Sequence, residues 1–193
     1  MPGHAFHEKI GDIVTSIVNK DDERTYCLLS DDCSRKDREG GYHALKIFGN
    51  DEDGNSMEYA RADLLIVHDG LIVGQVEIEE EDRSPTKLFG KIISSAHSTY
   101  YEYKSGLAPK EKGPIKFSDR FKFIQIVRYD KSEYTKESGH PAKWERVERD
   151  IKSMLNNSEI GFSSPTKRKI EYKLLFGDIR EIEGTLGKIM LKF

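Results

Sequence analysis

The sequence has few cysteines, no long apolar run and no large excess of one charge, and each shortage narrows the class of protein. Its two cysteines, Cys27 and Cys33, are too few for a disulfide scaffold and fit no zinc pattern, so we expect reduced thiols in a cytoplasmic protein. No stretch approaches the roughly 18 apolar residues of a membrane span, and residues 1–5 lack the pattern of a signal peptide. The net charge of -3 excludes a uniformly basic coat for nucleic acid, but it leaves a local basic groove open.

What is present suits one folded domain. The chain has 193 residues, which is long enough to bury a core, and no repeat, low-complexity segment or linker divides it. Charged residues make up 34% of the sequence, while nine Phe and nine Tyr supply bulky material for the interior. We therefore expect a single domain over residues 1–193.

Three segments have the pattern of helices. Residues 5–20 carry apolar side chains at helical spacing, with acidic residues on the opposite face. Ser84 and Pro85 open the second helix, since a hydroxyl suits the N-cap and proline suits the first helical position. Residues 141–155 form the third, with one apolar side. Residues 21–41 are polar and lack a pattern, so we expect a loop there.

The remaining apolar segments predict strands in a mixed sheet. The expected strands are residues 43–48, 57–67, 71–80, 121–129 and 170–176, with a further short one at 189–193. Asp69-Gly70 is a signal for a tight hairpin, so the first three strands should form an antiparallel meander. Residues 106–118 are expected to be a loop. The predicted class is α/β (α+β), a mixed sheet flanked by helices.

Three carboxylates are expected to meet on this meander. Glu77 and Glu79 alternate with Val76 and Ile78, so both acids should point to one face of the strand. A tight hairpin at Asp69-Gly70 makes residues 63 and 77 cross-strand neighbours to within one residue of register. Asp63 lies inside an apolar strand, where a lone carboxylate is costly to bury unless something pairs with it.

A cation is the simplest partner for such a cluster. Three carboxylates repel one another unless a positive charge neutralises them, and hard oxygen ligands suit Mg²⁺. We expect the neighbouring acids Glu80, Glu81 and Asp82 to be a solvated strand end. Asp63 and Glu77 have apolar neighbours on both sides, which favours a metal site there.

This order of elements and acids resembles the PD-(D/E)XK nuclease superfamily, which has the restriction-endonuclease-like fold. The resemblance covers residues 5–130, and residues 141–193 are expected to complete the same domain. It implies that Asp63 and Glu77 bind the metal, as one or two Mg²⁺ ions, and that Glu79 occupies the position of the usual catalytic lysine. Ala62 stands where the family usually has proline.

The replacement of the usual lysine leaves two alternatives. Glu79 can bind a second metal or act as a base to water, as Glu-x-Glu members of the family imply. Alternatively the lysine has moved to Lys87, which begins the following helix and could lean back over the strand ends. Both Glu79 and Lys87 are therefore candidate catalytic residues beside Asp63 and Glu77.

Two basic segments are candidates for contacts with DNA phosphates. One face of the helix after Ser84 carries Lys87, Lys91, Ser94 and Ser98 at helical spacing, and it could position a duplex without reading its sequence. An ordinary solvated helix face is the alternative. The second segment is the loop that holds Lys110, Lys112 and Lys116.

The resemblance implies a Mg²⁺-dependent endodeoxyribonuclease that hydrolyses double-stranded DNA. A type II restriction endonuclease that acts as a homodimer fits one small domain, because two-fold symmetry would match a palindromic duplex. Two alternatives remain open. One is a repair or mobile-element nuclease that is structure-selective or non-specific. The other is a non-catalytic module that binds DNA or protein and has kept the fold.

Overall fold

The structure is a computed structural model of the chain, and it describes most of the sequence. The described residues are 5–19, 26–30, 45–50, 56–80, 84–102, 114–129, 141–156 and 168–190. Within them the helices are α1 (Ala5–Asn19), α2 (Pro85–His97), α3 (Pro141–Asn156) and α4 (Ile179–Met190). The strands are β1 (Tyr26–Ser30), β2 (Leu45–Asn50), β3 (Ser56–Ala62), β4 (Leu64–His68), β5 (Leu71–Glu79), β6 (Tyr100–Tyr101), β7 (Ile115–Arg128) and β8 (Lys169–Gly177).

The strands form one mixed sheet, which confirms the predicted class. Among the described residues its order is β1-β4-β5-β7-β6-β2-β3, and β8 pairs with β7. β1, β4 and β5 are antiparallel neighbours, whereas β5, β7 and β8 run parallel. The chain passes from β5 to β7 through α2, which is the usual way to join parallel strands. The long strand β7 pairs with β6 near its start and with β5 and β8 further along.

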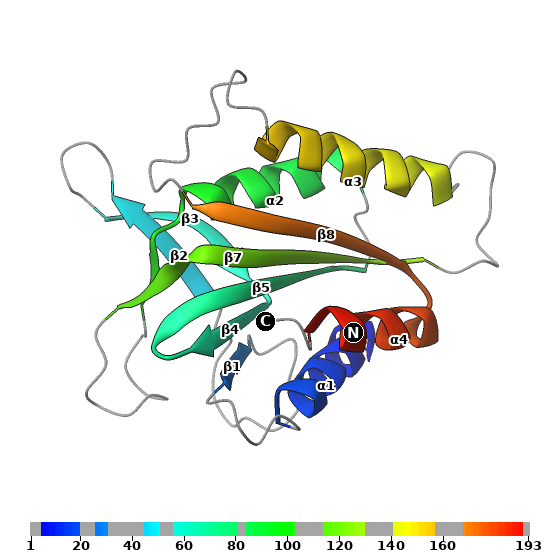
Figure 1. Ribbon diagram of the computed structural model, residues 1–193, viewed down its shortest axis with the longest axis horizontal. Helices are drawn as coiled ribbons and strands as arrows, with labels where there is room; N and C mark the ends of the chain where they lie inside the picture. Colours follow the sequence, from blue (N-terminus) through cyan, green and yellow to red (C-terminus); the bar gives the residue numbers. More distant parts are fainter. Residues whose placement is uncertain are drawn as a thin grey trace.

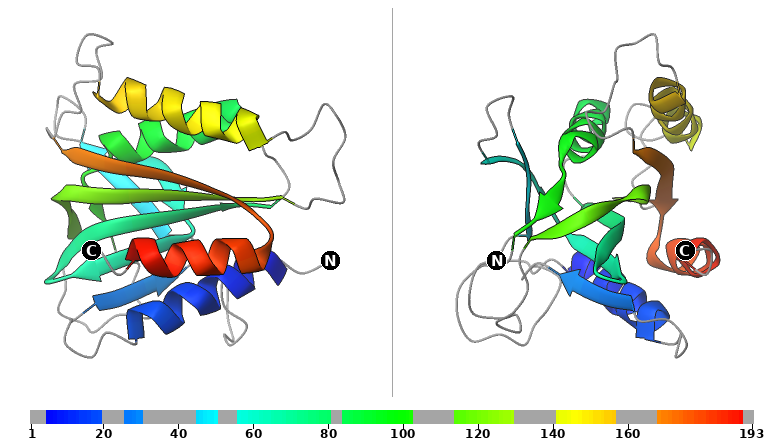
Figure 2. Two further views of the ribbon diagram at one scale, coloured as in Figure 1. Left: turned by 45° about the vertical axis from the view of Figure 1, so that its right-hand side comes forward. Right: turned by 60° about the vertical axis from the view of Figure 1, so that its left-hand side comes forward.

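Helices cover both faces of the sheet, and each face has its own apolar core. Figures 1 and 2 show α2 and α3 on one side of the strands and α1 and α4 side by side on the other. The first side buries Leu88, Ile92 and Trp144 against the sheet. The second buries Ile10 and Leu186. Because strand side chains alternate, successive residues of β5 and β7 enter different cores.

The predicted helices are confirmed, and the start of α2 has the expected cap. The Ser84 side chain accepts a hydrogen bond from the Lys87 backbone N–H at 3.3 Å, and Pro85 is the first helical residue. The predicted hairpin is confirmed as well. Asp69 and Gly70 both have positive φ, 50° and 75°, as a two-residue turn of this type requires.

The cap of α2 supplies a stability prediction. Ser84→Ala removes the side-chain acceptor for an N–H at the helix start, so we expect a loss of about 1 kcal/mol in the free energy of unfolding. Thr86→Ala is the matched control, because Thr86 is exposed in the same turn and surface changes cost within about 0.5 kcal/mol. Urea denaturation of both variants measures the difference. Equal midpoints would show that the Ser84 hydroxyl contributes nothing.

The expected meander needs two corrections. The segment 57–67 is two strands rather than one: β3 pairs with β2, β4 pairs with β1 and β5, and Asp63 lies at the bend between them. The outer strand beside β4 is β1, within residues that were expected to be a loop. The short apolar stretch of β1 gave little signal because polar residues surround it. The expected first strand, observed as β2, does pair antiparallel with the first part of the expected second strand, now β3, and it also pairs with β6.

Two further predictions are wrong in secondary structure. The expected strand at 189–193 begins inside α4, which ends at Met190, and residues 191–193 lie outside the described residues. Asp178 caps this helix, since its Oδ1 accepts from the backbone N–H of Arg180 at 2.9 Å and of Glu181 at 3.1 Å. The expected loop 106–118 includes the beginning of β7, and residues 103–113 lie outside the described residues.

Candidate carboxylate–lysine site

The hairpin register brings the three predicted carboxylates together. Leu64 pairs with Val76, so the residues just beyond that pair, Asp63 and Glu77, come side by side. Asp63 Oδ2 accepts a hydrogen bond from the backbone N–H of Ile78 at 2.7 Å, which fixes its side chain against β5. Glu77 and Glu79 follow on the face of β5 that α2 covers, while Val76 and Ile78 enter the opposite core.

Lys91 of α2 joins all three acids. Its Nζ lies 2.6 Å from Oε2 of Glu77, 2.7 Å from Oε1 of Glu79 and 3.9 Å from Oδ2 of Asp63. The expectation that Asp63 and Glu77 come within reach of one cation therefore agrees with the geometry. The cation at that point is the ammonium group of Lys91, a residue that was expected to face DNA.

Lys87 closes the outer side of the cluster. Its Nζ lies 2.7 Å from Oε2 of Glu79, so Glu79 stands between two ammonium groups. The side chains of Glu77 and Glu79 are only 1% exposed, whereas those of Lys87 and Lys91 are 38% and 24% exposed. The acids thus form the buried floor of the site, and the two lysines lie between that floor and solvent. The expectation that a lysine from this helix leans back over the strand ends agrees with this arrangement.

Burial and the pairing of Lys91 with the carboxylates shift the pKa values of this cluster in opposite directions. Burial raises the pKa of Glu77 to about 8, and the neighbouring charge of Asp63 adds to the shift, while Lys91 and Gln75 oppose it. Burial alone would lower the pKa of Lys91, but its three carboxylate neighbours outweigh that effect and raise it. The two directions are compatible, because Glu79 and Asp63 hold the proton on Lys91 even when Glu77 is neutral.

A buried polar layer continues beneath α2, and sequence reasoning missed it. Gln75 Nε2 donates to Oε1 of Glu77 at 2.6 Å. Gln125 of β7 is the register partner of Glu77 of β5. Its Nε2 donates to the Leu88 carbonyl at 3.2 Å, and its Oε1 accepts from the Tyr172 hydroxyl at 2.6 Å. A lone polar residue within the apolar run of β7 was the available signal for Gln125. It is the same signal that identified Asp63.

The predicted DNA-contacting ridge on α2 is not a uniformly exposed face. Lys87 and Lys91 lie against the carboxylates. Ser98 is fully buried, and its hydroxyl donates to the backbone carbonyl of Ser94 at 2.9 Å. Ser98 is therefore unavailable to a phosphate in this arrangement, and Ser94 is half-buried. The side chain of Lys87 is more exposed than that of Lys91.

The second basic segment is described only at its end. Lys110 and Lys112 lie outside the described residues. Lys116 lies in β7, opposite Tyr100 of β6, and it is exposed. It is thus a residue of a strand rather than of the expected loop. Its role in binding DNA stays a prediction.

Glu80 was expected to be solvated, and that expectation is wrong. Its carboxylate lies 3.0 Å from His7 Nδ1 of α1 and 3.1 Å from Arg128 Nη1 at the end of β7. Glu81 and Asp82 lie outside the described residues. The acids at the end of β5 therefore divide between the two faces of the sheet, with Glu80 directed away from the carboxylate–lysine site.

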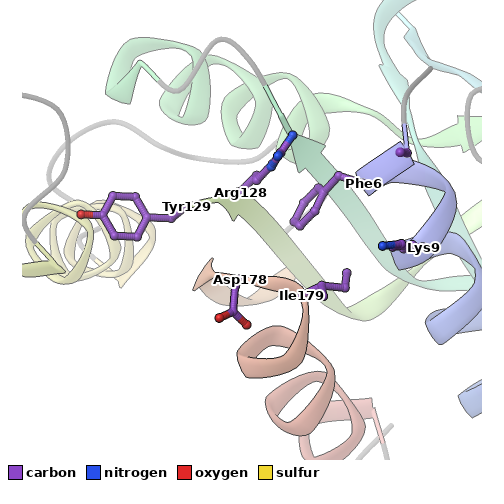
Figure 3. Close-up of a pocket in the computed structure, with 7 residues that line it drawn as sticks. Phe6, Lys9, Arg128, Tyr129, Asp178 and Ile179 are labelled. Atoms are coloured by element: carbon purple, nitrogen blue, oxygen red, sulfur yellow. The ribbon is translucent and has the colours of Figure 1, made fainter. Parts of the chain in front are cut away.

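A small cavity lies beside Arg128, the partner of Glu80. It has a volume of about 230 Å³ between the start of α1, the end of β7 and the start of α4 (Figure 3). Phe6, Lys9, Arg128 and Ile179 are among its lining residues, and the Arg128 guanidinium stands 5.9 Å from the centre of the Phe6 ring. None of Asp63, Glu77 and Glu79 lines it. The cavity is therefore separate from the carboxylate–lysine site.

The donor set of the site is suited to a hard divalent cation, with one obstacle. Carboxylate oxygens are the ligands that Mg²⁺ prefers, and those of Asp63 and Glu77 already face one common cation. As arranged, however, no group of three His, Cys, Asp or Glu side chains in the described part of the chain could hold a metal ion. Because the ammonium of Lys91 stands among the acids, a metal could bind them only after Lys91 moved.

Comparison of the chain with protein-family models, curated proteins and solved structures gives no match. Across the described residues, no helix is long and apolar enough to cross a membrane.

Proposed function

We propose that the protein is a Mg²⁺-dependent endodeoxyribonuclease that hydrolyses phosphodiester bonds of double-stranded DNA, and that it acts as a type II restriction endonuclease, a cytoplasmic homodimer. The observation that carries the proposal is the convergence of Asp63, Glu77 and Glu79 on one cation position at the end of β5. Two lysines beside those acids supply positive charge where a polyanion would approach.

The arrangement of elements also supports the resemblance to the PD-(D/E)XK superfamily. The antiparallel strands β1, β4 and β5 follow an N-terminal helix, and α2 leads from β5 to the parallel strand β7. Asp63 directly precedes the middle strand of the three, and Glu77 and Glu79 end the third. With β1 in place of the expected first strand 43–48, this order is compatible with the resemblance, and β2 and β3 are then an addition between β1 and β4.

Each residue then has a distinct task. Asp63 and Glu77 would hold Mg²⁺, which when bound polarises the phosphodiester and lowers the pKa of water. Glu79 holds Lys87 and Lys91 by two contacts of 2.7 Å, so it orients both ammonium groups, and a carboxylate there can also accept a proton from water. Lys87, the more exposed lysine, would contact a backbone phosphate.

Cleavage of supercoiled plasmid DNA tests the proposal. The full-length chain should cut in Mg²⁺ and leave the plasmid intact in EDTA. Discrete fragments would identify a restriction endonuclease. A smear would identify a non-specific or structure-selective nuclease instead. An intact plasmid over a range of Mg²⁺ and Mn²⁺ concentrations would contradict nuclease activity on this substrate.

One observation favours a second candidate function. Because Lys91 and Lys87 already pair with the acids, the cluster can serve as a purely structural ion network in a non-catalytic module that binds DNA or protein. Retention of a labelled duplex in EDTA, together with an intact plasmid in Mg²⁺, would favour that function over the nuclease.

A further inference from the structure

The centre of the carboxylate cluster is held by a side chain that can move. Lys91 Nζ is within 2.7 Å of Glu77 and Glu79 and 3.9 Å from Asp63. The backbone below it is anchored, because Leu88 and Ile92, on either side of Lys91 in α2, are fully buried. The Lys91 side chain itself is 24% exposed, and its four-carbon stem is flexible. The ammonium can thus swing to solvent while α2 stays in place.

We propose that Lys91 is a displaceable counter-ion of the carboxylate site: its ammonium occupies the site in the metal-free protein, and a divalent cation binds Asp63 and Glu77 only as that ammonium leaves. The inference rests on the metal site of the proposed function. It assigns Lys91 the task of regulating metal entry, which comes before any contact with a phosphate.

The Lys91 ammonium and a divalent metal ion compete for the same place, both because of space and because of charge. An ammonium in contact with Glu77 and Glu79 stands where a metal shared by the acids would have to bind. A positive charge a few ångströms from a divalent cation also repels it strongly at the low effective dielectric of a buried site. Lys87 competes much less, because of the three acids its ammonium contacts Glu79 alone, at Oε2 on the outer side.

Displacement would also tie metal binding to substrate binding. When all three carboxylates are ionised, as metal binding requires, they and the two ammonium groups together carry one net negative charge. A bound divalent cation reverses that sign, and the released Lys91 ammonium then lies with Lys87 on the solvent side. Both changes favour an approaching phosphate. The metal-free protein is thereby kept stable by its own counter-ion, without a cation from solution.

Lys91→Met is the direct test, because it removes the charged ammonium and keeps an unbranched, flexible stem that is one atom shorter. Calorimetric titration of the full chain with Mn²⁺ should show binding at least about tenfold tighter than in the parent, since even part of the repulsion between the charges exceeds the free energy of a tenfold change. Lys87→Met is the matched control, and we expect its Mn²⁺ affinity to stay within about threefold of the parent.

Thermal unfolding gives a second readout that does not depend on activity. In EDTA, Lys91→Met should melt below the parent, because the buried acids have lost their counter-ion. Mn²⁺ should raise the melting temperature of Lys91→Met far more than that of the parent, since a ligand of the folded state stabilises it according to its affinity. Lys91→Gln is the second variant if the methionine variant does not fold, because an amide can still donate to Glu77.

The results separate this inference from the nuclease proposal. Tighter Mn²⁺ binding by the Lys91 variants supports the displaceable counter-ion even if neither they nor the parent cuts DNA. Binding that is unchanged or weaker in the Lys91 variants overturns it even if the parent cuts DNA efficiently. Absence of Mn²⁺ binding in the parent and in every variant also overturns it.

Discussion

Replacing Glu77 with glutamine should abolish Mg²⁺-dependent cleavage of DNA and leave the chain folded. Glu77 is the buried acid at the centre of the cluster, in contact with Lys91 and Gln75. An amide keeps its shape but is a far weaker ligand for a hard cation. A metal supplies several kcal/mol to phosphodiester hydrolysis, so we expect a loss of about 10³-fold or more in the cleavage rate.

The fold should survive because the substitution removes a charge that burial disfavours. Lys91 keeps Glu79 and Asp63 as partners. Glu58→Gln is the control: Glu58 is an exposed acid of β3 that pairs with Lys46 and Arg61. That variant should cut at the parent rate. A folded Glu77→Gln variant with the cleavage rate of the parent would exclude Glu77 from the active site.

Glu79→Gln should have the second largest effect on cleavage. The change removes the negative charge between Lys87 and Lys91, so the two ammonium groups lose their orientation. If Glu79 also accepts a proton from the attacking water, that contribution is lost as well. A general base contributes about 10²–10⁴-fold, and we expect the rate at saturating Mg²⁺ to fall within that range. Binding of a duplex in EDTA should be as tight as in the parent or tighter, since a repulsive charge is gone.

The structure also decides which substitution of Glu79 is informative. Lysine is the usual residue of the resembled family at this place, yet a lysine here would bury a third ammonium beside Lys87 and Lys91. That variant should fail to fold, whereas Glu79→Gln keeps the shape of the side chain. Cleavage by Glu79→Gln at the parent rate would reduce Glu79 to a structural partner of the lysines.

Local patterns predicted the parts of the fold that carry their own signal. The stripe of α1, the serine and proline that begin α2, and the Asp69-Gly70 turn each act within a few residues, so the sequence alone locates them. β1 and the split between β3 and β4 depend on pairing with distant strands. α4 is amphipathic over its whole length, and its last residues alone do not reveal that period.

The site was predictable only as far as strand geometry reaches. Alternation along β5 and the register of a tight hairpin placed Glu77 beside both Glu79 and Asp63. The partner of these acids was missed, because Lys91 is directed by the way α2 packs on the sheet, and its spacing on the helix is equally compatible with a solvated face. The contact between Gln125 and Tyr172 was missed for the same reason, since it joins β7 to β8.

Anomalous diffraction from a crystal soaked in Mn²⁺ shows whether Asp63 and Glu77 form a metal site. We expect an anomalous peak bound by carboxylate oxygens of both residues, with Lys91 Nζ moved away from its place between Glu77 and Glu79. A crystal in which Mn²⁺ binds only elsewhere, or not at all, while Lys91 keeps its contacts with the acids, would contradict a metal site there.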